Sequence, residues 1–202
     1  MADGHHRSAA ASRAHRALRG DGGEHDAFLA VVFPHDQVQI LPYNRVVSDP
    51  RGRSADELLA AVRARMDLEP VEDREQAAPA EPHTFGIYVD KNWYRARARP
   101  GSFDVSDPVA SLDCSICQDQ LLGPIFEVKD PRRDPQIECI GGIRGLAELE
   151  RRVDSGSHSM AFALYPTQVD ELLRVSDAGL LMPPKSTWFE PKLRSGLFVH
   201  AF

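Results

Sequence analysis

The residue types that point most directly to chemistry open the chain, as Asp3, Gly4, His5, His6 and Arg7. The Ala- and Arg-rich stretch that follows predicts a helix with Asp3 as its N-cap. The free backbone N–H groups of a first helical turn, an open approach over Gly4 and the His and Arg donors suit a phosphate or a carboxylate. The alternative, which the sequence leaves equally open, is a chain terminus whose polar side chains are only solvated.

A second candidate lies near the carboxyl end, behind the dipeptide Pro183-Pro184. Two prolines stiffen a loop and reduce the entropy lost when a ligand orders it. Cationic and hydroxyl side chains follow at short spacing: Lys185, Ser186, Thr187, Lys192, Arg194 and Ser195. Such a set can hold several phosphate oxygens, although it lacks the glycine framework of a Walker loop. We favour an anion-binding loop over a surface loop with incidental charges.

Asn44 and Arg45 form a third candidate, after a hairpin predicted from the segments 27–33 and 38–41. The two side chains could complete a polar pocket. Arg45 could equally form an ion pair with one of the many carboxylates of this acidic chain. The sequence leaves both interpretations open.

The three cysteines offer the spacing of a metal or redox site, since Cys114 and Cys117 form a CxxC pattern and Cys139 follows. A structural zinc needs four ligands, and no well-placed histidine completes this set. The segment 107–122 is predicted as a helix, in which residues three apart share one face. We therefore expect packed thiols and no metal site.

Hydrophobic periodicity and breaker residues predict the elements that must position these candidates. Strands are expected at 27–33, 38–41, 84–89, 93–98, 125–128, 136–140, 159–164 and 197–202. Those at 84–89 and 93–98 are expected to pair around a turn at Asp90, Lys91 and Asn92. Helices are expected at 3–18, 54–66, 107–122, 143–153 and 168–176. Ser54 and Glu57 form a capping-box pattern at the start of the second helix. The acidic, Pro- and Ala-rich stretch 69–83 is predicted as a mobile loop.

Strands and helices alternate without a strict βαβ period, which predicts an α/β or α+β fold with a mixed sheet and several flanking helices. The chain has 202 residues, and we expect one domain over 1–202. A net charge of −6 without a basic stripe argues against binding to nucleic acid. No apolar run approaches the ~18–20 residues of a membrane span, and residues 1–20 resemble no signal segment, so we expect a cytoplasmic protein. The oligomeric state is left open.

Three blocks of the sequence together resemble the bacterial domain-of-unknown-function family 1015. They are the opening Asp3–Arg7, then Leu41–Val47, then Met182–Thr187 with Phe189–Lys192 and Ser195–Leu197. They occur in the family's order and span nearly the whole chain. The first block lies near the middle of family members, so the resemblance implies that this chain corresponds to the C-terminal half of a longer, here incomplete, fold. Gln118 stands where family members usually carry a histidine.

The opening block is also similar to the Gly-His-Arg signature of the ParB and sulfiredoxin superfamily, which includes free-serine kinases. There the motif lies at a helix start and binds nucleotide phosphates. The resemblance implies a nucleotide ligand (ATP, ADP or CTP) with Mg²⁺, and phosphoryl transfer to a small hydroxyl substrate such as free serine. His6, Arg7, Lys185 and Lys192 would then stabilise charge on the phosphates. Two alternatives stand beside this enzyme: a non-catalytic, ParB-like nucleotide switch, and an inactive fragment of a longer protein.

Overall fold

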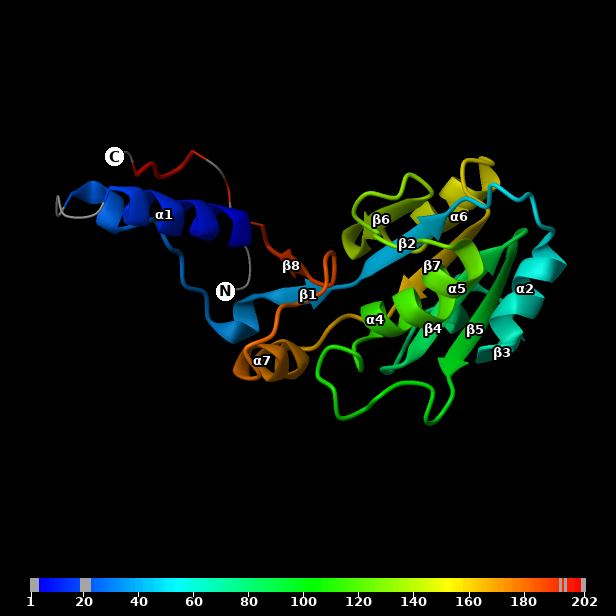
Figure 1. Ribbon diagram of the computed structural model, residues 1–202. Coiled ribbons are helices and arrows are strands. Elements are labelled where there is room, and N and C mark those ends of the chain that lie inside the picture. The colour runs from blue at the N-terminus through cyan, green and yellow to red at the C-terminus, as the bar shows by residue number, and fades with distance from the viewer. Residues whose placement is uncertain (1–3, 19–22, 193, 195, 201–202) are drawn as a thin grey trace. The chain divides into compact units, whose positions relative to one another are not determined.

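The computed structural model describes residues 4–18, 23–192, 194 and 196–200 (Figure 1). The chain forms two compact units: the first comprises Met1–Gln39 and Phe189–Phe202, and the second comprises Ile40–Trp188. The division falls within two short strands, β1 (Gln39–Leu41) and β8 (Trp188–Glu190), which pair as a two-stranded sheet.

The second unit is built on a six-stranded sheet in the order β3-β5-β4-β7-β2-β6. Each neighbouring pair is antiparallel, and the sheet does not close, so β3 and β6 are its edges. Its strands are β2 (Tyr43–Val47), β3 (Met66–Val71), β4 (Thr84–Val89), β5 (Asn92–Ala98), β6 (Ile137–Gly141) and β7 (Met160–Leu164). The predicted combination of helices and sheet is confirmed, and the antiparallel pairing makes α+β the better description.

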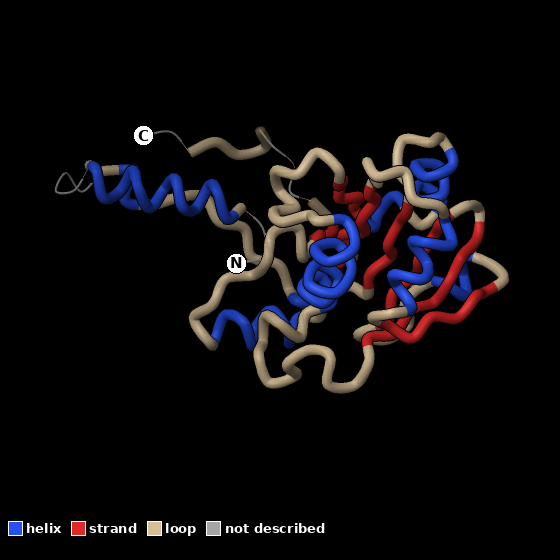
Figure 2. Tube along the Cα trace, turned by 45° about the vertical axis from the view of Figure 1, so that its right-hand side comes forward, coloured by secondary structure: helices blue, strands red, loops and turns tan. Residues whose placement is uncertain are grey.

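The central strands β4 and β7 are buried at every position. Alternate side chains of β7 face opposite sides of the sheet: Met160 and Phe162 belong to one apolar cluster, and Ala161 and Ala163 to another. Helices cover both faces, as Figure 2 shows for the strands and helices of this unit. A strand buried on both faces is apolar at consecutive positions, which explains the continuous run at 159–164.

The helices of the second unit divide between these two clusters. On the face of Phe162 lie α2 (Ala55–Arg63), α4 (Asp113–Cys117), a π-helix, η3 (Gln118–Leu122), α5 (Gly123–Phe126) and α7 (Val169–Asp177). On the face of Ala161 lie α3 (Arg74–Ala77) and α6 (Ala147–Asp154), the latter preceded by the short η4 (Gly142–Arg144). The arrangement is a sheet between two helical layers.

Two local predictions are confirmed in detail. The capping box of α2 is present, because the Glu57 N–H donates to Ser54 Oγ over 3.3 Å and the Ser54 N–H donates to the Glu57 carboxylate over 2.8 Å. The hairpin of β4 and β5 turns at Asp90 and Lys91, whose φ angles are 47° and 63°. Positive φ at both central residues is typical of a type I′ turn, whose twist matches that of the strands.

The prediction of a loop over 69–83 is wrong for two of its segments. Residues 69–71 complete β3, which pairs with β5 over its whole length, and Arg95 of β5 forms an ion pair with Glu69 over 3.2 Å. Asp73 then caps α3 by accepting from the Gln76 N–H over 2.9 Å. Arginines of the neighbouring strand compensate the acidic residues, which composition alone did not reveal.

The strand predicted at 27–33 is also wrong, because this segment of the first unit has no regular structure. Phe28 and Leu29 are half exposed and Val32 is 92% exposed. An apolar run becomes a strand only where it finds a pairing partner, and none is present among the described residues. The strand predicted at 197–202 is likewise absent over 197–200, and its last two residues lie outside the described part.

The first unit contains α1 (His5–Ala17) and the short 3₁₀-helices η1 (Glu24–Asp26) and η2 (His35–Gln37). His15 Nδ1 lies 2.8 Å from an Asp26 carboxylate oxygen, which joins α1 to η1.

In the second unit, the strand predicted at 125–128 is absent. Residues 125–126 end the helix α5, whose first turn contains Pro124, a position where proline is tolerated. In the described part of the chain, no helix has both the length and the apolar character that crossing a membrane requires.

Candidate functional site

The site begins with Arg45 in β2, a strand between β6 and β7. The residue is only 3% exposed. Its guanidinium donates to the carbonyl of Tyr43 over 2.8 Å and to that of Lys185 over 2.9 Å. No Asp or Glu within the described ranges forms an ion pair with it. Burying a charge is costly unless an opposite charge compensates it, so Arg45 is electrostatically prepared for an anion.

Two hydrogen bonds to consecutive carbonyl groups hold the backbone at Lys185 and Ser186. Arg45 binds the Lys185 carbonyl, and Thr167 Oγ1 donates to the Ser186 carbonyl over 3.0 Å. Ser186 itself is buried, while the Lys185 side chain is exposed and its Nζ lies 5.4 Å from the centre of the Tyr43 ring. The loop is therefore positioned by bonds that leave its ammonium group available to solvent.

Trp188 fixes the far end of this loop through a close approach to Gly141 at the end of β6. A Cβ atom at Gly141 would lie 2.5 Å from atoms of the Trp188 ring, so only glycine leaves room for it. The Trp188 ring also packs edge-on against Tyr43, with ring centres 5.3 Å apart. Residues from β2, β6 and the loop thus form one packed group beside Arg45.

Arg45 lines a cleft of about 380 Å³, within the size range of small-molecule sites. We name it the Arg45 cleft. Its walls come from the α4 and η3 helices, the turn after Val128 and the proline-led approach to Lys185. The lining residues are Arg45, Cys114, Ser115, Gln118, Asp119, Leu122, Lys129, Asp130, Pro131, Arg132, Pro183 and Pro184.

The charges of the Arg45 cleft are unevenly compensated. Asp130 is bound by Arg132, with 3.1 Å between the Arg132 Nε and a carboxylate oxygen. Lys129 and Asp119 are exposed, and neither forms an ion pair with another described residue. Three cationic and two acidic side chains line the cleft, which leaves one net positive charge in a chain whose net charge is −6. Such a local field favours an anionic ligand.

Gln118 adds a hydrogen-bond acceptor to the wall of the cleft. Its Nε2 donates to the Val128 carbonyl over 2.7 Å, which fixes the orientation of the amide because a carbonyl only accepts. The Oε1 atom is buried and has no partner. Gln118 begins the π-helix, and single π-turns within helices are frequent at functional sites.

The two thiols of the CxxC pattern are buried, as predicted for packed cysteines. Burial raises the pKa of Cys114 to about 11 and that of Cys117 to about 12, so both are protonated at neutral pH. Neither is a reactive thiolate. Within the ranges described above, no group of three or more His, Cys, Asp or Glu side chains is placed to hold a metal ion.

Asn44 does not line the cleft, which corrects its prediction as a pocket residue. It is buried, and its Oδ1 accepts the Leu164 N–H over 3.1 Å. That bond provides a partner for the backbone of β7, so the role of Asn44 is structural. Of the Asn44-Arg45 pair, the structure brings only Arg45 to the cleft.

The opening block belongs to the first unit. Gly4, with φ of 86°, precedes the first residue of α1, so Gly4 and not Asp3 occupies the N-cap position. Asp3 lies outside the described residues, and the structure does not describe the side chains of His5 and His6. Arg7 is exposed, and its Nε lies 3.6 Å from the place of a Cβ on Gly4. The phosphate cradle at the opening block stays a prediction.

The predicted C-terminal loop is divided between the two units. Lys185, Ser186 and the half-buried Thr187 lie in the second unit, near Arg45. Lys192 and Arg194 lie in the first unit and are exposed, and Ser195 falls outside the described residues. The structure therefore places Lys185 and Ser186 near Arg45, whereas Lys192 and Arg194 belong to the first unit.

Sequence reasoning missed the residues that the helix and the following turn contribute to the cleft. Lys129, Asp130 and Arg132 lie in a Pro- and Arg-rich turn, and Asp119 lies in the predicted helix. The signal was the charge density of that turn. Only the folded chain shows that this turn lies beside Arg45, a residue about eighty positions earlier in the sequence.

Comparison with known proteins now identifies the family. The model of the family described as "Protein of unknown function (DUF1015)" matches residues 1–115. The chain belongs to this family. No curated protein matches it in sequence.

Two solved structures resemble this DUF1015 chain in fold. A free serine kinase in complex with AMP is 14% identical with a TM-score of 0.50, and the match covers 93% of this chain and 65% of that one. A conserved hypothetical protein from Pyrococcus furiosus is also 14% identical, with a TM-score of 0.50 and coverage of 93% and 68%. This chain thus spans about two thirds of the length of either protein, and the likeness shows a shared fold.

Proposed function

We propose that this chain binds a nucleotide through its phosphates at the Arg45 cleft and takes part in phosphoryl transfer to a small hydroxyl substrate, such as free serine. The observation that carries the proposal is Arg45, a buried cation without an acidic partner among the described residues, which lines a cleft of ligand size. The fold shared with a free serine kinase that holds AMP supports the same assignment.

Positioning and charge neutralisation do most of the work in phosphoryl transfer. Arg45 can donate to phosphate oxygens from the floor of the cleft, and Lys129 can neutralise further charge from its rim. Lys185, whose carbonyl binds Arg45, has an exposed ammonium group that can serve the same purpose. In the first unit, Gly4, His5, His6 and Arg7 remain predicted phosphate ligands of their own.

In the transfer, the P–O bond of the phosphate anhydride breaks and the substrate oxygen forms a new P–O bond. The hydroxyl proton passes to a base, and the shortened nucleotide leaves. Of the two carboxylates that line the cleft, Asp130 is bound to Arg132, so we assign the role of base to Asp119. The described residues provide no multidentate metal site, so Mg²⁺ would enter as a complex with the nucleotide phosphates.

The first test is calorimetric titration of the protein with ATP, ADP and CTP in the presence of Mg²⁺. We expect binding by the wild type, at least tenfold weaker binding by Arg45→Gln, and a smaller loss for Lys129→Gln, which removes an exposed charge. Arg133→Gln is the matched control, because this neighbouring arginine is exposed and does not line the cleft. Equal affinity in all four proteins, or no heat with any nucleotide, would contradict the proposal.

A second test separates catalysis from binding. Nucleotide consumption is measured by ³¹P NMR with and without free serine, using the wild type and Asp119→Asn. We expect serine-dependent consumption by the wild type, and retained binding without consumption by the variant. Binding without consumption in both proteins would refute phosphoryl transfer and leave the nucleotide-switch alternative.

A further inference from the structure

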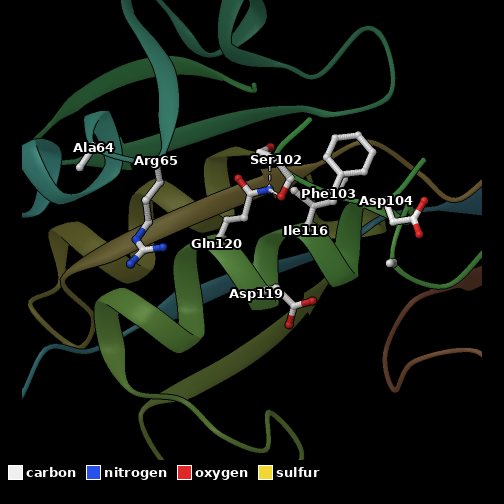
Figure 3. A pocket seen from close by; sticks show the side chains of 9 residues that line it. Ala64, Arg65, Ser102, Phe103, Asp104, Ile116, Asp119 and Gln120 are labelled. Carbon is white, nitrogen blue, oxygen red and sulfur yellow. Dashed lines mark hydrogen bonds between the residues drawn. The ribbon is translucent and has the colours of Figure 1, made fainter. Parts of the chain in front are cut away.

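A second cavity, of about 500 Å³, lies in the second unit (Figure 3). It is bordered by Arg65, between α2 and β3, by the loop of Ser102–Asp104, and by Asp119 and Gln120 of the π-helix. We name it the Gln120 cavity. Asp119 lines both this cavity and the Arg45 cleft, so the π-helix provides polar residues to two neighbouring spaces.

The Gln120 side chain carries a buried hydrogen-bond acceptor that no described residue satisfies. The residue is 8% exposed, and its Nε2 donates to the Ser102 carbonyl over 3.1 Å and to Ser102 Oγ over 2.9 Å. The bond to a carbonyl fixes which amide atom is nitrogen. The buried Oε1 has no partner, and in Figure 3 it points away from Ser102. A buried acceptor without a donor is costly, so a ligand that donates is favoured.

Both positively and negatively charged side chains line the cavity around Gln120. The Arg65 side chain is exposed and forms no ion pair or hydrogen bond with another described residue, and the same holds for the Asp119 side chain. Asp104 accepts from the Ser106 N–H and hydroxyl over 2.8 and 2.6 Å, and these bonds lower the pKa of its carboxyl, which keeps it ionised. The cavity therefore presents one guanidinium and two carboxylates.

Phe103 and Ile116 add an apolar wall to this polar set. Figure 3 shows both on the opposite side of Gln120 from Arg65. The Phe103 ring packs against His83, with ring centres 4.6 Å apart, and Ile116 is buried. The wall is thus part of the packed structure, which gives the cavity a defined shape.

We infer that the Gln120 cavity binds a small zwitterion in which a primary ammonium lies beside a carboxylate. The ammonium donates to Gln120 Oε1 in the negative field of Asp104 and Asp119, and Arg65 binds the carboxylate of the ligand in the bidentate manner of arginine. A short aliphatic group contacts Phe103 and Ile116. This inference goes beyond the proposed function, because it requires neither a nucleotide nor phosphoryl transfer.

The test is a titration of the whole protein with L-alanine, followed by NMR. Ethylamine and propionate are the matched probes that lack, respectively, the carboxylate and the ammonium. For so small a ligand we expect a dissociation constant on the order of 1 mM for L-alanine. Either matched probe is expected to bind at least tenfold more weakly than L-alanine, because each carries only one of the two charged groups that the cavity binds.

The variants assign the binding to this cavity. Arg65→Gln removes an exposed, unpaired side chain and is expected to weaken L-alanine binding at least tenfold while leaving the fold intact. Arg63→Gln is the control, since Arg63 is an exposed arginine two positions earlier that does not line the cavity. Gln120→Met removes the acceptor and is expected to have a similar effect on binding.

Three results would overturn the inference: no binding of L-alanine, binding unchanged in Arg65→Gln, or ethylamine binding as tightly as L-alanine. Since L-alanine has no hydroxyl group to phosphorylate and no nucleotide is added, failure here leaves the nucleotide test of the Arg45 cleft unaffected. Conversely, L-alanine binding without nucleotide binding would support this site alone.

Discussion

Two buried charges in and just after strand β2 have opposite environments. At the centre of the strand, Arg45 is bonded to carbonyl groups and lacks a carboxylate partner among the described residues. Just after its end, the Asp49 side chain is 1% exposed and is bound by Arg53 through Nε over 2.9 Å and through Nη2 over 3.0 Å. The Arg53 backbone N–H adds a further bond of 3.0 Å to the same carboxylate.

This difference separates a charge that stabilises the fold from one that is available to a ligand. The side-chain hydrogen bond from Arg53 lowers the pKa of Asp49 to about 2, so the carboxylate is ionised and compensated across the physiological range. Arg53 also donates to the Ile125 carbonyl over 2.9 Å and lies 5.4 Å from the Phe126 ring centre, which ties the start of α2 to α5. Only an anion from outside would complete the environment of Arg45 in the same manner.

The largest effect is expected from Asp49→Asn. Removing one partner of a buried pair leaves the other uncompensated, and we expect the free energy of unfolding to fall by about 3 kcal/mol at pH 7. Arg45→Gln loses only bonds to carbonyls, and we expect about 1 kcal/mol. Urea unfolding measures the loss of stability in both variants. A larger loss for Arg45→Gln than for Asp49→Asn would contradict the distinction between the two charges.

The Asp49 pair also has a defined pH dependence. Its folded pKa of about 2 lies below the ordinary value of 3.8, so its contribution is fully present above about pH 4 and is lost as the pH falls toward 2. The stability difference between the wild type and Asp49→Asn should therefore shrink over that window. A difference that stays constant from pH 5 to pH 2 would contradict the assignment.

The second effect concerns Asp113, a buried carboxyl with no basic partner among the described residues. Burial raises its pKa to about 8, against the His83 N–H, which donates to it over 2.7 Å. Asp113 is thus protonated in the fold and ionised in the unfolded chain between about pH 4 and pH 8. Unfolding releases a proton in this window, so stability falls as the pH rises.

Asp113→Asn removes this penalty while its amide oxygen can still accept the His83 N–H. We expect the variant to gain stability relative to the wild type by more than about 1 kcal/mol between pH 5 and pH 8. Urea unfolding at these two pH values measures the gain. A loss of stability in the variant that grows with pH would show that the carboxylate of Asp113 is compensated, as that of Asp49 is.

The smallest effect is expected from Gly141→Ala. The added methyl group would meet the Trp188 ring, and we expect a cost of about 1 kcal/mol as the ring moves. Because Trp188 ends the loop that carries Lys185, nucleotide affinity at the Arg45 cleft should fall several-fold. The control is Ser176→Ala, at an exposed position of α7 that does not line the cleft. Unaltered affinity in Gly141→Ala would show that the loop position does not matter for binding.

Local sequence signals determined a large part of the second unit. Ser54 and Glu57 specified the start of α2, and the Asp90-Lys91 turn between two apolar segments specified the β4–β5 hairpin. The buried strand at 159–164 was evident from its continuous apolar run. These features depend on residues close in sequence, so a single chain is sufficient to predict them.

Other features depended on contacts between distant segments and could not be read locally. Residues 69–71 of the acidic stretch form a strand because they pair with β5, where Arg95 lies opposite Glu69. The apolar segment 27–33 lacks such a partner and remains irregular. The interruption of the predicted helix at 107–122 by a π-turn likewise has no signal that we recognise in the sequence.

For the site, the sequence by itself determined which residues could hold an anion, since Arg45 and Lys185 are cations whatever the fold. The tertiary structure decided that the Lys185 carbonyl binds Arg45, that Asn44 does not line the Arg45 cleft, and that Gln118, Lys129 and Arg132 do. Burial made the difference, because the cost of an uncompensated charge arises only when folding removes it from water. The sequence shows which residues are charged, and only the folded structure shows which of these charges is buried without an oppositely charged partner.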